Sequence, residues 1–379
     1  MSEERLENLR VLYRINKPDV TPNAIIVTDP GKDLDDENAL ILAAGLHRIN
    51  MINLVGVIAN LEPSLERACL AKGTLKMLGL PNIPVGQGAA CFTGGINLKH
   101  ETEAEYSASP KEIVEGATLY QNLLKNAEDK SVILILNSGL TDTAQVFEKD
   151  PDTFIKKVFS VSIMGGVVSD KGDVLRDERG FMQAQVGKGG ASNNCFDESA
   201  AEYVHKVCQE NRIQLTILMR EAAYACQIPV SFYDKLAETG NPIGINLRNR
   251  QMTSINILWQ AANANEGSPV RGSLPMSRDR AWFLKTFCAG INPDASYQGD
   301  IWPYVGKFQL YDPMNVIAAV PALCYRFFNP TEVPVRGEVH NVIGLNKENH
   351  GIDNEKALRS FMMNAEIATL EMAQKEMQK

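Results

Sequence analysis

Five acidic side chains stand close together near the N-terminus, in the stretch Asp29-Pro30-Gly31-Lys32-Asp33-Leu34-Asp35-Asp36-Glu37. Like charges at this spacing raise one another's pKa, so something must offset their repulsion. A helix N-terminus does so, and so does a hard cation such as Ca²⁺, which takes several oxygen ligands at once. The stretch is therefore a candidate metal site. An acidic run that faces solvent at the start of a helix is the simpler alternative. For Asp33 and Glu37 we expect that simpler role, as solvated or helix-capping residues.

The acidic stretch directly follows an apolar run at residues 25–28, and a helix is predicted over 36–47. The carboxyl end of a strand is where open α/β sheets bind their ligands. This position favours a functional site over a solvated cluster of charges.

Strand and helix patterns alternate along the first half of the chain. Apolar runs predict strands at 25–28, 51–58, 83–85, 132–136 and 158–164, and helices are predicted at 36–47, 63–78, 111–126 and 141–148. Such alternation predicts an α/β fold with a mainly parallel central sheet flanked by helices. The C-terminal part is more helical, with helices expected at 198–210, 229–239, 251–264, 278–288, 313–322 and 355–375 and one strand at 215–218.

The chain shows neither an internal repeat nor a low-complexity linker, so we expect an N-terminal arm at 1–20 and a single domain at 21–379. Segments 86–110, 167–192 and 264–300 are rich in Gly, Ser and Pro and predict long loops around a site.

Composition excludes several classes of partner. With 44% apolar and 22% charged residues, the 379-residue chain is typical of soluble globular proteins. A net charge of −8 argues against nucleic acid as a partner. We also expect no membrane association, because no apolar run approaches the roughly 18 residues that a spanning helix needs. The sequence leaves open whether the chain forms a homo-oligomer.

The seven cysteines form no C-x-x-C pair, and the N-terminus lacks the apolar core of a signal peptide. Free thiols in a cytoplasmic protein are therefore expected. Secretion by a non-classical route is the alternative if the chain is an effector. The five histidines lack zinc-ligand spacing, and neither a phosphate-binding loop nor a G-x-S-x-G nucleophile motif is present.

The motifs resemble those of the nucleoside hydrolase family, the inosine–uridine-preferring N-ribohydrolases. The family's Asp-Pro-Gly-x-Asp-Asp turn is matched by Asp29-Pro30-Gly31 with Asp35-Asp36, with two extra residues between them. The similarity continues in family order to about residue 320, through the segments Gly56–Asn60, Pro81–Gly86, Leu136–Asp142, Met164–Gly166 and Tyr311-Asp312-Pro313.

This resemblance implies a role for each matched residue. Asp29, Asp36 and Asp312 would bind Ca²⁺ together with the main-chain carbonyl of Asn137, or of Ser138 if the alignment shifts by one. Asp29 would also take the proton of a water whose pKa the metal lowers.

Three further residues, Asp35, Asn60 and Asn193, would contact the ribose. Asp35 could instead brace the metal site. Each amide has a simpler structural explanation: Asn60 as a turn residue, Asn193 as a helix cap and Asn137 as an ordinary strand end. Asp312 before Pro313 could likewise only cap a helix.

The sequence departs from the family pattern at positions that matter for catalysis. Tyr311 replaces the family histidine that protonates the departing base, and its ordinary pKa of about 10 makes it a weaker acid. His100 is an alternative acid. Ala191 stands where the family has the glutamate for the 5′-hydroxyl, and the basic loop 271–280 would suit a 5′-phosphate unless it is simply solvated. The two extra residues in the acidic turn and the replacement of His by Tyr311 resemble a divergent branch that includes nucleoside-hydrolase-like effectors of plant-pathogenic bacteria.

We therefore predict Ca²⁺-dependent hydrolysis of the N-glycosidic bond of a ribonucleoside or a 5′-phosphorylated nucleoside derivative. The substrate is thus a small nucleoside-like or nucleotide-like molecule. The alternative is a metal-dependent protein that binds ribose or ADP-ribose and has lost turnover. A Mg²⁺ phosphohydrolase is a weaker rival, because the strand carries no D-x-D motif.

Overall fold

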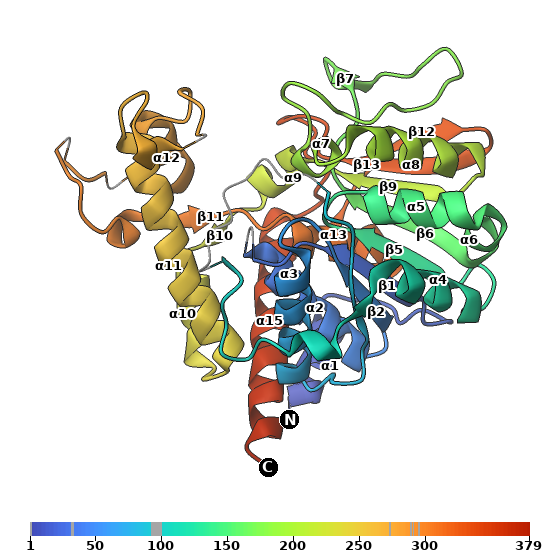
Figure 1. Cartoon of the computed structure of the whole chain (residues 1–379), viewed down its shortest axis with the longest axis horizontal. Coiled ribbons are helices and arrows are strands. Elements are labelled where there is room, and N and C mark those ends of the chain that lie inside the picture. The colour runs from blue at the N-terminus through green and yellow to red at the C-terminus, as the bar shows by residue number, and fades with distance from the viewer. Residues whose placement is uncertain are drawn as a thin grey trace.

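Strand β1 (Asn23–Thr28), which leads into the acidic stretch, lies inside the central sheet of the computed structural model (Figure 1). The structure describes residues 2–31, 34–91, 101–272, 274–288, 290, 292–294 and 296–379. Within these residues the sheet has nine strands in the order β12-β13-β9-β6-β5-β1-β2-β3-β4. Its other strands are β2 (Asn53–Ala59), β3 (Val85–Gln87), β4 (Val114–Glu115), β5 (Val132–Leu136), β6 (Val158–Met164), β9 (Gln214–Leu218), β12 (Thr331–Val335) and β13 (Glu338–Ile343).

Neighbouring strands of this sheet are parallel, except that β12 and β13 pair antiparallel. The chain passes from β1 to β2 on one side and later returns to β5 on the other side of β1. The strand order therefore reverses beside β1, and such a switch point is where open α/β sheets form their ligand crevice.

Both faces of β1 are buried, which explains its continuous apolar sequence. Ala24 and Ile26 belong to one hydrophobic core, and Ile25 and Val27 to the other. The first core packs beneath α2 (Asp35–Arg48), α3 (Ser64–Met77), α13 (Asp312–Ala319) and α15 (Glu355–Met377). The second packs beneath α4 (Gly116–Asn126), α5 (Thr141–Lys149), α6 (Pro151–Lys157) and α8 (Glu198–Glu210).

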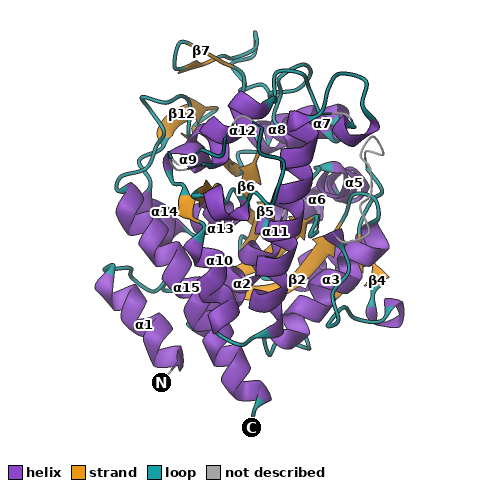
Figure 2. Ribbon diagram, turned by 90° about the vertical axis from the view of Figure 1, so that its left-hand side faces the viewer, coloured by secondary structure: helices purple, strands orange, loops and turns teal. Residues whose placement is uncertain are grey.

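The remaining elements surround this three-layer body. Helix α1 (Ser2–Leu12) packs on α15, and the Arg5–Glu371 ion pair joins the two at 2.5 Å. Figure 1 shows α11 (Pro242–Asn263) and α12 (Arg280–Phe287) to one side of the sheet, and Figure 2 shows α11 from the front. The other elements are α7 (Ser192–Cys195), α9 (Arg220–Ala225), α10 (Ser231–Glu238), α14 (Pro321–Phe327) and the pairs β7 (Ser169–Asp170) with β8 (Asp173–Val174) and β10 (Ile228–Pro229) with β11 (Lys307–Phe308).

The predicted α/β fold with a mainly parallel sheet and a more helical C-terminal part is confirmed. Helix α4 begins at Gly116 instead of residue 111, because the edge strand β4 precedes it and Glu115 caps it. The antiparallel pair β12–β13 was not predicted. Its turn at Arg336-Gly337 takes positive φ angles of 51° and 84°, as a two-residue hairpin turn requires.

The prediction of free cysteines is also confirmed, since all seven are unpaired, and all except the half-buried Cys195 are buried. None of the helices in the described ranges is both long enough and apolar enough to cross a membrane.

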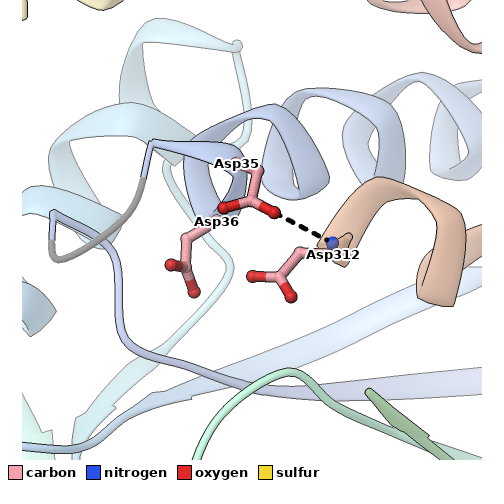
Figure 3. Close-up of side chains that lie close together, drawn as sticks. All are labelled: Asp35, Asp36 and Asp312. Atoms are coloured by element: carbon pink, nitrogen blue, oxygen red, sulfur yellow. Dashed lines mark hydrogen bonds between the residues drawn. The ribbon is translucent and has the colours of Figure 1, made fainter. Parts of the chain in front are cut away.

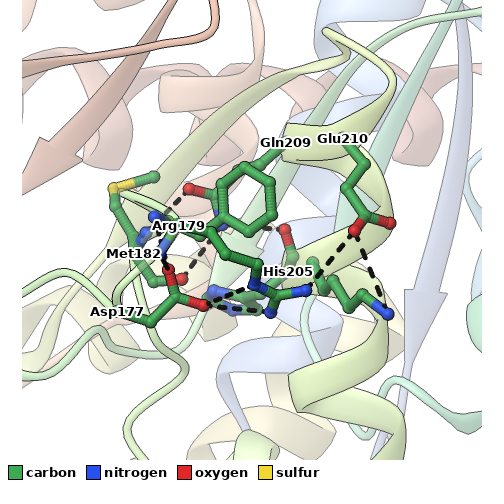
Figure 4. Close-up of polar contacts among 8 residues, drawn as sticks. Asp177, Arg179, Met182, His205, Gln209 and Glu210 are labelled. Carbon is green, nitrogen blue, oxygen red and sulfur yellow. Dashed lines mark hydrogen bonds and ion pairs between the residues drawn. The ribbon is translucent and has the colours of Figure 1, made fainter.

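The loop before α7 is hydrogen-bonded to α8 next to the buried His205 (Figure 4). The Gln209 side chain accepts from the Met182 N–H at 2.8 Å and donates to the Met182 carbonyl at 3.0 Å. It also donates to the carbonyl of His205, whose two ring nitrogens lack a hydrogen-bond partner among the described residues. The imidazole of His205 is therefore held in an apolar place as the neutral base.

Acid should destabilise the protein through this histidine and its neighbour His340. Burial lowers the pKa of each to about 4, with Arg176 adding to the effect on His340. In the unfolded chain both histidines bind protons near pH 6.5, whereas in the folded protein they do so only near pH 4. Proton binding therefore favours the unfolded chain, and the free energy of unfolding falls as the pH drops from about 6.5 towards 4.

A His205→Leu variant should remove up to about 3 kcal/mol of that acid sensitivity. Urea unfolding of both proteins between about pH 7 and about pH 4.5 checks this. Equal loss of stability in the variant and the wild type would show that His205 does not contribute.

Candidate metal centre and its surroundings

Three buried carboxyl groups meet at the carboxyl end of the sheet (Figure 3). Asp35 and Asp36 are the first residues of α2, and Asp312 is the first residue of α13. One oxygen from each lies within 4.8 Å of the others, and all three residues are buried. We call Asp35, Asp36 and Asp312 the acidic cluster. It joins parts of the chain that are almost 280 residues apart in sequence.

Asp36 is held by the end of β1. Its Oδ1 accepts hydrogen bonds from the Thr28 hydroxyl and, at 2.9 Å, from the Asp29 N–H. These bonds orient the carboxyl group and fix where α2 starts relative to the strand.

Asp35 braces the second helix of the cluster. Its Oδ2 accepts from the Tyr311 N–H at 2.8 Å and from the Asp312 N–H at 3.2 Å, the bond drawn in Figure 3. Asp35 thus caps the N-terminus of α13 from another helix, which satisfies N–H groups that have no partner within α13. The Tyr311 side chain, which precedes α13, makes no such cap, and the carboxyl group of Asp312 remains in the cluster.

Burial and mutual repulsion make this cluster costly to ionise. Burial, then the charges of Asp29 and Asp35, raise the pKa of Asp36 well above its ordinary value. Burial, then Asp35, Asp36 and Asp29, do the same for Asp312. Among the described residues no Lys or Arg forms an ion pair with Asp36 or Asp312, so no basic side chain of these residues offsets the repulsion. The donor set, several carboxylate oxygens converging in a buried place, fits a hard divalent cation.

Asp29 lies beside the cluster, near enough for its charge to raise the pKa of both Asp36 and Asp312. The buried guanidinium of Arg67 on α3 fixes this turn by donating to the carbonyls of Asp29 and Pro30 at 3.0 and 3.1 Å. Sequence reasoning missed Arg67, because nothing in its local sequence marks it as a partner of the acidic turn.

Three amides lie at the strand ends next to the cluster, of which Asn137 and Asn315 are buried and Asn193 is half-buried. The Asn193 amide donates to the carbonyl of Asn137 at 2.8 Å and to that of Met164 at 3.0 Å. Asn315 on α13 donates to Oδ1 of Asn137 at 2.7 Å. These bonds bring Asn137 and Asn193 together beside the cluster. Asn315 was not predicted, although its spacing of three residues from Asp312 places both on one face of a helix.

Asn60 is fully buried after β2 and holds neighbouring loops. Its amide donates to the Gly139 carbonyl at 2.9 Å and to Asp142 Oδ2 at 2.8 Å, and its Oδ1 accepts from the Ser138 hydroxyl at 2.6 Å. These bonds give Asn60 a structural role, since they join the end of β2 to the loop before α5. Its predicted contact with ribose stays a prediction.

The ring of Tyr311 lies against a second aromatic ring, that of Tyr224. The rings of Tyr311 and Tyr224 meet edge to face, 6.3 Å apart at an angle of 73°. The bond to Asp35 uses the Tyr311 backbone N–H, so that bond does not require the hydroxyl of the side chain.

The expectation that Glu37 is solvated or caps the helix is wrong. Glu37 is fully buried, and its Oε2 pairs with Arg250 of α11 at 2.5 Å. Its Oε1 accepts from the hydroxyls of Thr74 and Tyr106 at 3.0 and 2.9 Å. Asp33 and His100, which were also considered, lie outside the described residues.

Two arginines of loop 271–280 make their contacts within the protein, with residues of this loop and of α11. The buried Arg271 donates to the carbonyls of Ala264 and Pro275 at 2.9 and 2.8 Å. Arg280 lies over the Trp259 ring at 4.5 Å and donates to Asn263. Both arginine side chains thus have partners in the protein, and neither is a solvated group that a phosphate would need as its ligand.

Comparison with known proteins places this geometry in a family. The family model of the inosine-uridine preferring nucleoside hydrolases matches residues 24–347. The type III effector protein XopQ, solved in complex with adenosine diphosphate ribose, is 28% identical, with a TM-score of 0.80 over 97% of this chain and 99% of its own. The effector protein XOO4466 is 26% identical, with a TM-score of 0.78 over 97% and 98%.

A purine-preferring ribonucleoside hydrolase from Gardnerella vaginalis shares the fold, at 13% identity and a TM-score of 0.55 over 92% of this chain and 99% of its own. No curated protein sequence matches the chain. The family predicted from the motifs, and the similarity to its effector branch, are confirmed.

Proposed function

Because the chain belongs to the inosine-uridine preferring nucleoside hydrolase family, we propose that it hydrolyses the N-glycosidic bond of a ribonucleoside or of a 5′-phosphorylated derivative such as ADP-ribose, with Ca²⁺ as its cofactor. The observation that carries this proposal is the buried acidic cluster at the switch point of the sheet. The ADP-ribose complex of XopQ supports the phosphorylated class of ligand.

Asp29, Asp36 and Asp312 would hold the ion, with the carbonyl of Asn137 as a further ligand. A bound divalent cation supplies the charge that lowers the pKa of a nearby water and attracts the vicinal hydroxyls of a ribose. Asp35 keeps α13, and with it Asp312, in place for this task.

The protein groups then act on the sugar. Asp29 accepts the proton of the attacking water at its carboxylate. Cleavage of an N-glycosidic bond passes through an oxocarbenium-like state, and the carboxylates of the site stabilise its positive charge. Asn193, and Asn60 through its loops, set the position of the ribose. The phenol of Tyr311 donates a hydrogen bond to the departing base.

The second candidate is a binding protein that keeps the pocket without turnover. Tyr311 in place of an imidazole favours it, since a phenol with an ordinary pKa of about 10 is a poor acid at neutral pH. The two functions differ in whether base and free sugar are released.

One assay separates these candidates. The purified chain is incubated with nucleosides, nucleoside monophosphates and ADP-ribose in Ca²⁺ or in chelator, and released base and reducing sugar are measured. Hydrolysis predicts release that stops in chelator. Saturable binding of a ribose ligand without release over hours would contradict hydrolysis and leave the binding protein. Inorganic phosphate as the only product would identify a phosphohydrolase instead.

Substitution of Tyr311 tests the leaving-group step. Tyr311→Phe keeps the backbone bond to Asp35 and the aromatic ring and removes only the hydroxyl group. The value of kcat should therefore fall about a hundredfold, with KM nearly unchanged. Tyr311→His should raise kcat for substrates whose base needs a proton. Steady-state kinetics on the best substrate of the panel check both variants. Unchanged kcat in Tyr311→Phe would exclude the phenol from the reaction.

A further inference from the structure

A cavity of about 510 Å³ lies between α15 and the β10–β11 pair, and its lining is basic, in contrast to the acidic cluster. One wall is a single stripe of α15, since its residues recur every three or four positions: Lys356, Arg359, Ser360, Met363, Asn364 and Ile367. The other wall is formed by Gln227, Ile228, Pro229, Lys235, Gly306 and Lys307 of α10, β10, β11 and their flanks. Figure 1 shows these elements beside α15.

Four of these lining residues are cationic, and none is acidic: Lys235, Lys307, Lys356 and Arg359. The nearest acidic residues in sequence are engaged elsewhere, since Asp234 pairs with Arg248 at 2.7 Å and Glu355 with His350 at 3.3 Å. Within the described ranges none of the four cations forms an ion pair. In a chain with a net charge of −8, such a concentration of uncompensated positive charge is unexpected.

The polar groups of the cavity are those that recognise an oxyanion. The Nε of Arg359 is buried and has no hydrogen-bond partner among the described residues, and an unpaired buried donor is costly. Arginine and lysine are the side chains that bind phosphate. The volume falls in the range of small-molecule sites, roughly 300–1,000 Å³, and Ile228 and Met363 add apolar contact.

We propose that this cavity, lined by Lys235, Lys307, Lys356 and Arg359, is a binding site for a small phosphorylated anion, separate from the acidic cluster. No residue of the acidic cluster lines it. The site is thus distinct from the proposed glycosidic reaction and does not depend on it. The group that the site would recognise is a phosphate, which either a soluble molecule or a lipid headgroup could carry.

The test is a calorimetric titration of inorganic pyrophosphate into the full-length chain, in chelator and without divalent cations. We expect one saturable site per chain. Arg359→Gln and Lys307→Gln should each weaken binding about tenfold or more, because each removes a charge-assisted hydrogen bond. The exposed Lys356→Gln variant gives the same test at a position where folding is not at risk. Lys206→Gln on α8, outside the cavity, is the matched control and should bind as the wild type does.

Further arms distinguish the alternatives. Asp312→Asn should bind pyrophosphate normally, which separates this site from the proposed hydrolase centre. Loss of binding in Asp312→Asn with normal binding in Arg359→Gln would place the anion at the acidic cluster and overturn the proposal. Non-saturable heats, or equal heats with chloride at the same ionic strength, would also overturn it.

Vesicles of phosphatidylcholine with phosphatidic acid identify the source of the phosphate. Sedimentation of the protein with them, lost in Arg359→Gln, would support a lipid headgroup as the source. Pyrophosphate binding with no sedimentation would support a soluble ligand.

Discussion

Asp312→Asn should abolish release of base from every substrate and, in the absence of metal, stabilise the folded protein. Burial, and then repulsion from the neighbouring Asp35 and Asp36, raises the pKa of the Asp312 carboxyl group well above its ordinary range. The amide keeps the shape and removes the charge. We expect kcat/KM to fall at least a thousandfold, about 4 kcal/mol of transition-state stabilisation.

The stability gain of Asp312→Asn should depend on pH in a definite direction. A carboxyl whose folded pKa is raised binds more protons in the folded state, so the wild type gains stability as the pH falls through that pKa. The variant's advantage should therefore be largest at alkaline pH and shrink on acidification. Urea unfolding in chelator measures it, with the exposed Asp152→Asn variant of α6 as control. A variant that is less stable than the wild type at alkaline pH would contradict the repulsion that we assign to the cluster.

Arg250→Met should destabilise the protein by about 3–5 kcal/mol, because it leaves Glu37 charged and unpaired in the interior. The pair joins α2 to α11 at 2.5 Å, with side chains that are 0% and 6% exposed for Glu37 and Arg250. Since Glu37 follows Asp36 directly, we expect hydrolysis to fall as well. The double variant Glu37→Leu/Arg250→Met should recover much of the lost stability, because no charge is then left uncompensated.

The chain offers a matched control on the same helix. Arg248 pairs with Asp234 at 2.7 Å, but these side chains are 35% and 41% exposed. Arg248→Met should therefore cost less than about 1 kcal/mol. Thermal and urea unfolding of the three variants give the comparison. If Arg248→Met and Arg250→Met cost the same, burial would not be the source of the effect.

The sequence was sufficient for the part of the site that is local. An apolar run followed by Asp29, Asp35 and Asp36 predicted strand β1, the start of α2 and a group of carboxylates between them, because these features depend only on neighbouring residues. The binding of a cation there stays a prediction. Pairing of this stretch with Asp312 needed the family resemblance, since no local pattern links positions so far apart.

Long-range contacts explain what the sequence did not reveal. Glu37 looked like another solvated acid, and only the folded chain brings Arg250 to it. The arginines of loop 271–280 looked like phosphate ligands or solvated charges, yet Arg271 bonds to carbonyls of its own loop and of the neighbouring α11. The cations of the cavity beside α15 come from three separate parts of the chain, and the order of residues in the sequence does not show that they meet.

The central claim is that Asp36 and Asp312 of the acidic cluster, together with Asp29, hold one cation that also binds the ribose. Calorimetric titration of Ca²⁺ into the wild-type chain, with and without ADP-ribose, tests it most directly. We predict one ion per chain, bound more tightly when ADP-ribose is present, because ligands that share a site are coupled in both directions. Asp312→Asn should lose both the binding and the coupling. Calcium affinity that is the same with and without ADP-ribose, or that survives in Asp312→Asn, would contradict the claim.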